Sequence, residues 1–383
     1  MEEEIQNYFS GINEVYEHVL IFIDNPDPDS EEDFTNLLQI IDTHGIDVNE
    51  EKFHHFISLL VNLANNHHRH TSFFSKIERI LSRYRRKIQE NSTNNEIFIE
   101  FASNKRLIYF LMKEGILKFD TKIAEIIKSK HEFICDGYSD FFNNEIEKSE
   151  NCKEENEIEM TEYEQKRQIG ENDLYICSLI RQGLVEEFIS YVTRHNISLS
   201  SRIKPSIFET NSFLIDKEPT LIEYAAFFGS IQIYEYLYLN GVAVNGSLWL
   251  YGIHSNNSDF LRNHIESKGI KPTDETCEEI LNESIKCHHN EIARYIQENL
   301  IDEKQMIKSK NRIQFNERVF NIAFKYNNYS FFLANFNDGC AFCNCCQYKY
   351  DTIVDLLIKS HRNLIEKKII QEKLLFNKIY LHN

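Results

Sequence analysis

The second half of the chain repeats one short pattern four times, and this repetition limits the fold more than any other feature of the sequence. Each copy has a small residue, a turn-forming residue four positions later, and an apolar residue four positions after that. This spacing fits a short helix, a reversal of the chain and a second helix with one apolar face. The small residues are Ala225, Gly252, Ser284 and Ala323, the turn residues are Gly229, Asn256, His288 and Asn327, and the apolar residues are Ile233, Phe260, Ile292 and Phe331.

A single hairpin of this size cannot bury its apolar face alone, so neighbouring hairpins are expected to stack. Gly and Asn suit the turns because they adopt positive φ at low cost. Gly (12 residues) and Pro (5 residues) are otherwise scarce in this chain of 383, which disfavours β architectures that need many tight turns. We therefore predict an all-α fold containing a helical-hairpin solenoid, with Trp249 in the core between repeats.

The first of these copies carries a family resemblance. The segment at 219–241, "PTLIEYAAFFGSIQIYEYLYLNG", is similar to the ankyrin repeat pattern T-P-L-H-x-A-A-x-x-G followed by a second helix and Gly. Pro and Thr are inverted, Glu223 or Tyr224 replaces the usual His, and the repeats are unequal in length. Together with "NLANNHHRHTSFFSKIERIL", "SLWLYGIHSNN" and "IKCHHNEIARYIQENL", it resembles a large protist family in which a helical N-terminal region precedes divergent ankyrin repeats. The resemblance covers roughly residues 30–335. It implies a scaffold for protein contacts and brings no catalytic residues.

The resemblance also implies a binding surface. In ankyrin stacks the residues between the small position and the turn project toward the concave side. Aromatic anchors with polar surroundings suit protein recognition. Alternatively, the first two of these residues, both Phe, pack on the preceding N-terminal segment. The predicted partner-binding residues, called pre-turn residues below, are Phe227, Phe228, His254, Ser255, Lys286, Cys287, Lys325 and Tyr326.

Three regions are predicted along the chain. Residues 1–144 form an N-terminal helical region, in which stretches such as "DFTNLLQIIDTHGI" place apolar residues at helical spacing before a Gly. Residues 145–171 are rich in Glu, bury little and read as an acidic linker or a loose, solvated helix. Residues 172–383 hold the repeats and a C-terminal cap.

The stretch "CAFCNCC" at 340–346 offers a different function. Cys340 and Cys343 have the spacing of a chelating half-site, Cys345 and Cys346 are adjacent, and His361 follows as a further ligand. A metal-binding or redox-sensing protein is thus the alternative to a scaffold. In the competing interpretation the stretch is a loop between helices, with some cysteines packed as small apolar groups.

Histidines also occur in clumps. His67 and His68 fall at a predicted helix end, where they could cap the last carbonyls. His288 and His289 lie at a repeat turn, where a His commonly bonds the backbone of its own repeat. No Asp or Glu lies at the spacing of a metal site from either histidine pair, so a role as metal ligands is the weaker interpretation.

No motif of an enzyme or a cofactor site is present. The chain lacks G-x-x-x-x-G-K-[ST], G-x-G-x-x-G, H-E-x-x-H and G-x-S-x-G. A net charge of −18 disfavours nucleic acid as a partner. The acidic start and the short apolar runs predict neither a signal peptide nor a membrane span, and hence an intracellular, cytoplasmic protein. We predict a noncatalytic scaffold or adaptor without cofactors that binds another protein.

Overall fold

The computed structural model describes residues 2–129, 137–151, 161–272, 274–301, 309–334 and 338–360. These residues form helices and connecting loops with no strand, so the all-α prediction is confirmed. None of the described helices is both long enough and apolar enough to cross a membrane. The first half contains α1 (Glu2–Asp24), α2 (Glu31–Thr43), α3 (Glu50–Asn66), α4 (Phe73–Arg83), α5 (Arg85–Asn91), α6 (Asn94–Phe101), α7 (Lys105–Lys113), α8 (Thr121–Lys128), α9 (Tyr138–Phe141), α10 (Asn143–Asn151) and α11 (Glu162–Ile169).

Apolar stripes at helical spacing hold these N-terminal helices together. On α2 the stripe buries Phe34, Leu37 and Ile41, and α2 packs along α1. The helix ends as the sequence predicts, because Gly45 takes a positive φ of 58° and lets the following backbone N–H groups bond back to the last turn. The same device recurs at Gly115 after α7.

Helices form at both ends of the segment 145–171, which the sequence predicts to be an acidic linker or a loose, solvated helix. Its two ends are the helices α10 and α11, and Thr161 and Glu164 form a capping box that starts α11. Arg167 on α11 is buried and pairs with Glu145 on α10, Nη1 to Oε1 at 2.8 Å. These ends therefore belong to the N-terminal region. Residues 152–160 of the predicted linker lie outside the described residues.

The second half is a row of helix pairs, called the hairpin row below. Within each pair the two halves contact each other, and each first helix also contacts the first helix of the next pair. In the described part of the chain the pairs are α12 (Tyr175–Gln182) with α13 (Val185–Arg194), α14 (Leu221–Phe227) with α15 (Ile231–Leu239), α16 (Leu248–Gly252) and η1 (Ile253–Ser255) with α17 (Ser258–Phe260), η2 (Leu261–Ile265) and η3 (Glu266–Lys268), α18 (Asp274–Lys286) with α19 (Asn290–Asn299), α21 (Ser309–Lys325) with α22 (Tyr329–Ala334), and α23 (Asp338–Gln347) with α24 (Asp351–Ser360).

The predicted turn residues and small residues lie where the sequence pattern places them in these pairs. All four predicted turn residues have positive φ, between 50° and 66°. All four small residues are buried or nearly so, and Trp249 is fully buried with its indole N–H donating to the Ile270 carbonyl at 2.8 Å. The structure adds two turns of the same kind, at Gly183 (φ 67°) and Lys349 (φ 59°). The row therefore extends by one pair at each end beyond the four that the sequence pattern revealed.

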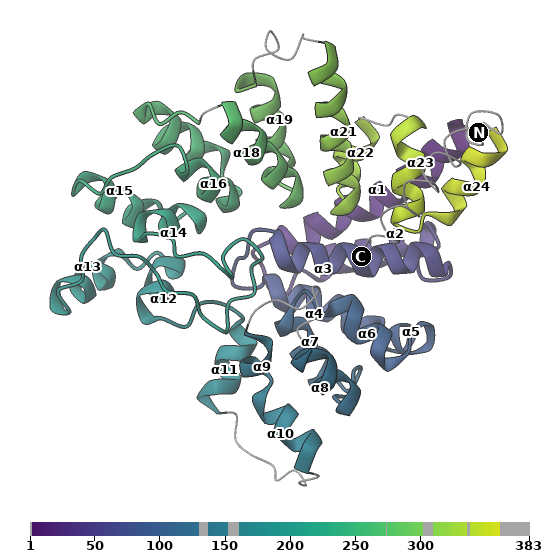
Figure 1. Ribbon diagram of the computed structural model, residues 1–383, viewed down its shortest axis with the longest axis horizontal. Coiled ribbons are helices and arrows are strands. Elements are labelled where there is room, and N and C mark those ends of the chain that lie inside the picture. Colours follow the sequence, from purple (N-terminus) through teal and green to yellow (C-terminus); the bar gives the residue numbers. More distant parts are fainter. Residues whose placement is uncertain are drawn as a thin grey trace, which may run out of the picture.

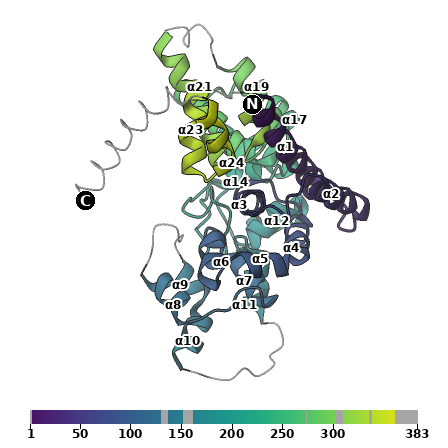
Figure 2. The ribbon, with the colours of Figure 1, turned by 90° about the vertical axis from the view of Figure 1, so that its right-hand side faces the viewer.

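The hairpin row curves around part of the N-terminal region. Figure 1 shows the pairs from α12 to α24 forming an arc, with α1 and α3 on its inner side. Contacts between α1 and α22 agree with this view. Helices α5–α11 extend from α3 away from α18–α24 (Figure 2). The inner side of the arc is thus shared between the repeats and the first helices of the same chain.

Candidate functional site

The pre-turn residues lie along the inner side of the arc, but half of them are buried. Lys325 is exposed, and Phe228, Lys286 and Tyr326 are half-buried. The other four are at most 6% exposed, so a partner cannot reach them, and the expectation of one continuous open surface is corrected. These four core residues are Phe227, His254, Ser255 and Cys287.

Two segments of the chain itself cover this part of the inner side. One is the histidine segment, residues 65–70, and the other is the covering loop, residues 209–214. From the covering loop, Phe213 lies against the Phe227 ring at 6.0 Å and the His254 ring at 4.3 Å between centroids. From the histidine segment, His68 Nδ1 lies 3.0 Å from the His254 carbonyl. Phe227 thus packs on the covering loop and not on the N-terminal region that the alternative interpretation named, and Phe228 is half-buried.

His67 joins three elements that are far apart in the sequence. Its Nδ1 lies 2.7 Å from the carbonyl of Cys287 in the hairpin row, and its Nε2 lies 2.7 Å from Asp24 at the end of α1. Burial alone would lower the pKa of His67, but the Asp24 carboxylate and the Cys287 carbonyl outweigh burial and raise it. The side chain therefore clamps α1 to the row and does not cap α3 as the sequence suggested.

Helix α1 and helix α3 also meet the turns of the row through polar groups. The Tyr16 hydroxyl accepts from Asn290 at 3.0 Å and lies 3.2 Å from His288 Nδ1. The Asn62 amide of α3 donates to Asn327 at 2.7 Å. Because buried polar groups are costly unless they are bonded, these contacts fix where the N-terminal helices dock.

A cysteine, a histidine and a carboxylate converge beneath the histidine segment. Cys287 Sγ lies 3.4 Å from His254 Nδ1, and His254 Nε2 lies 3.5 Å from Glu283 Oε1. Lys286 also pairs with Glu283, at 3.0 Å. Helix α18 supplies Glu283 and ends just before Cys287, while η1 of the preceding pair supplies His254. We call these three residues the Cys287 cluster.

In the Cys287 cluster a carboxylate contacts a histidine and the histidine contacts a cysteine, as in an enzyme with an activated cysteine nucleophile. The sulfur of Cys287 is nevertheless not reactive. A nucleophilic cysteine must be a thiolate that a substrate can reach. Burial raises the pKa of the Cys287 thiol well above its usual value, and the sulfur is fully enclosed. Burial, together with the nearby Lys286 and Lys217 charges, holds the pKa of His254 well below its usual value. The cluster therefore rests as a thiol beside a neutral imidazole.

Comparison of the chain with protein-family models, with curated proteins and with solved structures gave no match.

The cysteine-rich stretch is helical, not a loop as one interpretation had it. Cys343, Cys345 and Cys346 lie on α23, the first helix of the last pair. Cys345 is fully buried four residues before the Lys349 turn, where the four middle pairs carry their small residue, while Cys346 is exposed. Among the described side chains this stretch does not bring three ligand groups together. The side chain of Cys340 and all of His361 lie outside the described residues.

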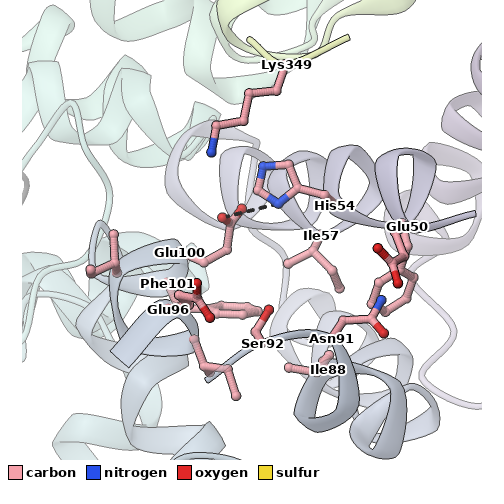
Figure 3. A pocket seen from close by; sticks show the side chains of 13 residues that line it. Glu50, His54, Ile57, Ile88, Asn91, Ser92, Glu96, Glu100, Phe101 and Lys349 are labelled. Atoms are coloured by element: carbon pink, nitrogen blue, oxygen red, sulfur yellow. Dashed lines mark ion pairs between the residues drawn. The ribbon is translucent and has the colours of Figure 1, made fainter. Parts of the chain in front are cut away.

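An open groove remains where the inner side is not covered. Its volume is about 370 Å³, and it lies between α3, helices α5–α6 and the α23–α24 turn. Figure 3 shows Lys349 reaching from that turn toward His54 and Glu100. A smaller hollow of about 160 Å³ shares His54 and Lys349 and includes Lys325. The groove has an apolar floor of Phe53, Ile57, Ile88, Ile97 and Phe101 and a rim of Glu50, Asn91, Ser92, Glu96, Ile99, Glu100, His54 and Lys349.

Charge on the rim of the groove is mostly negative. Three carboxylates face one lysine, and His54 Nδ1 lies 3.6 Å from Glu100 Oε2. Burial raises the pKa of Glu100, although the charges of His54 and Lys349 oppose that rise. Sequence reasoning missed this groove because its walls come from three separate regions. A lysine at the last turn gave no turn signal, so the last pair was not recognised.

Proposed function

We propose that the chain is a divergent ankyrin-like repeat protein, similar to the protist family named above, that acts as a noncatalytic scaffold and binds another protein. Like-oriented helix pairs with positive-φ turns support the ankyrin-like assignment. The observation that carries the scaffold proposal is the open groove at the uncovered end of the inner side, where repeat stacks commonly present their binding surface.

The groove favours a partner segment of particular chemistry. Its floor offers apolar and aromatic side chains, which suit an aliphatic or aromatic anchor. Its rim carries Glu50, Glu96 and Glu100, which favour a Lys or Arg beside that anchor. We propose that the partner inserts such a segment between α3 and the α23–α24 turn, so that Lys325 and Lys349 lie at one edge of the contact.

A displayed peptide library screened against the full chain tests this proposal. Peptides that bind would be measured against a Glu50→Lys, Glu100→Lys variant by fluorescence anisotropy. The control is Glu186→Lys, Glu187→Lys, which makes the same change in charge on exposed positions of α13. Each of the two glutamates would form a charge pair with the peptide worth about 0.5–1 kcal/mol, and the lysine substitutions turn both attractions into repulsions. We therefore expect the affinity of the groove variant to fall by about tenfold or more.

The outcome separates groove binding from general charge attraction. Basic-apolar peptides that bind the wild type and the α13 variant, and lose affinity for the groove variant, support the proposal. Peptides that bind both variants equally, or a screen that selects none, reject the groove as the binding site. Circular dichroism of each variant establishes that the fold is retained.

A further inference from the structure

We propose that the Cys287 cluster binds one Zn²⁺ ion, a property that goes beyond the scaffold role. One nitrogen, one thiol sulfur and one carboxylate oxygen, contributed by His254, Cys287 and Glu283, lie within 4.8 Å of one another. Zn²⁺ takes this mixture of ligands, with metal–ligand bonds of about 2.0–2.3 Å. The ligand atoms around such an ion lie about 3.3–3.8 Å apart, given those bond lengths and tetrahedral angles.

The observed spacings fit that arrangement. Cys287 Sγ lies 3.8 Å from Glu283 Oε1, and His254 Nε2 lies 3.5 Å from the same oxygen. Glu283 and Cys287 are four residues apart, so they lie on one face of the α18 turn. All three ligand atoms already lie within 4.8 Å of one another, and binding of the ion draws them together. The fourth position is left for water, as in zinc sites with three protein ligands.

An unpartnered buried nitrogen is the second observation that points to a ligand. The His254 side chain is 2% exposed, and its Nε2 has no hydrogen-bond partner although it faces the Glu283 carboxylate. A buried polar atom without a partner is costly. Coordination of a cation, with Glu283 opposite, satisfies this nitrogen.

The charges of Glu283 and Lys286 cancel without the ion, and with zinc bound the site carries one net positive charge, that of Lys286. Without zinc, Cys287 is a thiol and Glu283 pairs with Lys286. Binding releases the thiol proton to solvent and forms a bond between sulfur and zinc, so one thiolate and one carboxylate neutralise the ion. Lys286 keeps a partner because a carboxylate has two oxygens. Glu283 is 16% exposed and marks the side from which an ion enters.

Cobalt titration of the reduced full-length chain tests the site. Tetrahedral Co²⁺ bound to a thiolate gives visible d–d bands and a near-ultraviolet charge-transfer band, and Zn²⁺ added afterwards should abolish both. The test variants are Cys287→Ser and Glu283→Gln. The matched control is a chain in which Cys340, Cys343, Cys345 and Cys346 are all replaced by Ser, which removes the other cysteine cluster.

The site predicts stoichiometric bands in the wild type and in the control, and no charge-transfer band in Cys287→Ser. Glu283→Gln should weaken Co²⁺ binding by about tenfold or more. A chain with no bands, or bands that survive in Cys287→Ser or vanish in the control, would overturn the proposal. If circular dichroism shows that Cys287→Ser does not fold, Glu283→Gln decides, and unchanged affinity in that variant rejects the site.

Discussion

Arg167 offers the sharpest test of how the acidic segment is built into the fold. Its side chain is 2% exposed, and its guanidinium donates to Glu145 at 2.8 Å and lies 4.1 Å from the centre of the Tyr109 ring. The rings of Phe141, Phe142 and Tyr163 lie within 5.8 Å of it. Two of its nitrogens have no hydrogen-bond partner and face this aromatic surrounding. Arg167 therefore holds α11 on α7–α10 by one ion pair and by cation–π contacts.

The substitution Arg167→Met keeps most of the apolar stem and removes the charge. Breaking a buried pair costs about 3–5 kcal/mol. The Glu145 side chain is 18% exposed, so water recovers part of that cost. Cation–π contacts at a desolvated site add about 1–2 kcal/mol. A net destabilisation of about 3 kcal/mol follows, which corresponds to a change of roughly 150-fold in the opening equilibrium of α11.

Hydrogen exchange followed by mass spectrometry measures this effect locally, without the assumption that the whole chain unfolds in one step. Amides of α11 and α7 should exchange about two orders of magnitude faster in Arg167→Met. The control is Lys166→Met, whose partially exposed pairs with Glu162 and Asp173 are worth less than about 1 kcal/mol. Equal exchange in the two variants would refute the reasoning, because Arg167 would then act as an ordinary surface cation.

Three further predictions concern single positions. Cys345→Leu should destabilise the chain by about 1–3 kcal/mol in urea unfolding, because the small site is fully buried, while Cys346→Leu at an exposed position should change stability far less. Gly170→Ala should cost about 1–2 kcal/mol, since φ is +71° and the added methyl meets the Arg106 side chain. Burial lowers the pKa of His55 to about 3, whereas the same histidine in the unfolded chain has a pKa of about 6.5. Between these two pH values the unfolded chain binds one more proton than the folded chain. Stability should therefore fall by about 1.4 kcal/mol per such group between pH 7.5 and 5.5, and His55→Gln should remove that share of the loss in unfolding measured at both pH values.

The sequence predicted what depends on local spacing. The turn residues Gly229, Asn256 and Asn327 are visible in it because few residue types tolerate positive φ. Lys349 takes the same conformation with a side chain that gives no such signal, so the last pair was missed and its first helix was interpreted as a cysteine-rich loop.

The inner side of the arc could not be predicted in the same way. Whether a pre-turn residue such as His254 is open or covered depends on segments 186 residues away, as its contact with His68 shows. The periodicity of apolar residues in the sequence is the same whether the residue is open or covered. It shows which face of a helix is apolar, but not which element covers that face. The groove around His54 could not be predicted for the same reason, because it is formed by three separate regions of the chain, none of which has a distinctive sequence pattern.

The covered inner side changes how the hairpin row is stabilised. Contacts in a simple repeat array run only between neighbours, so parts of the array open independently. Here Asp24, His67 and Asn62 connect α1 and α3 to turns of several pairs at once. Opening of the fourth pair exposes the Cys287 carbonyl and breaks the His67 clamp, and loss of α1 removes the Asp24 carboxylate that pairs with His67. The N-terminal region and the middle of the row therefore stabilise each other.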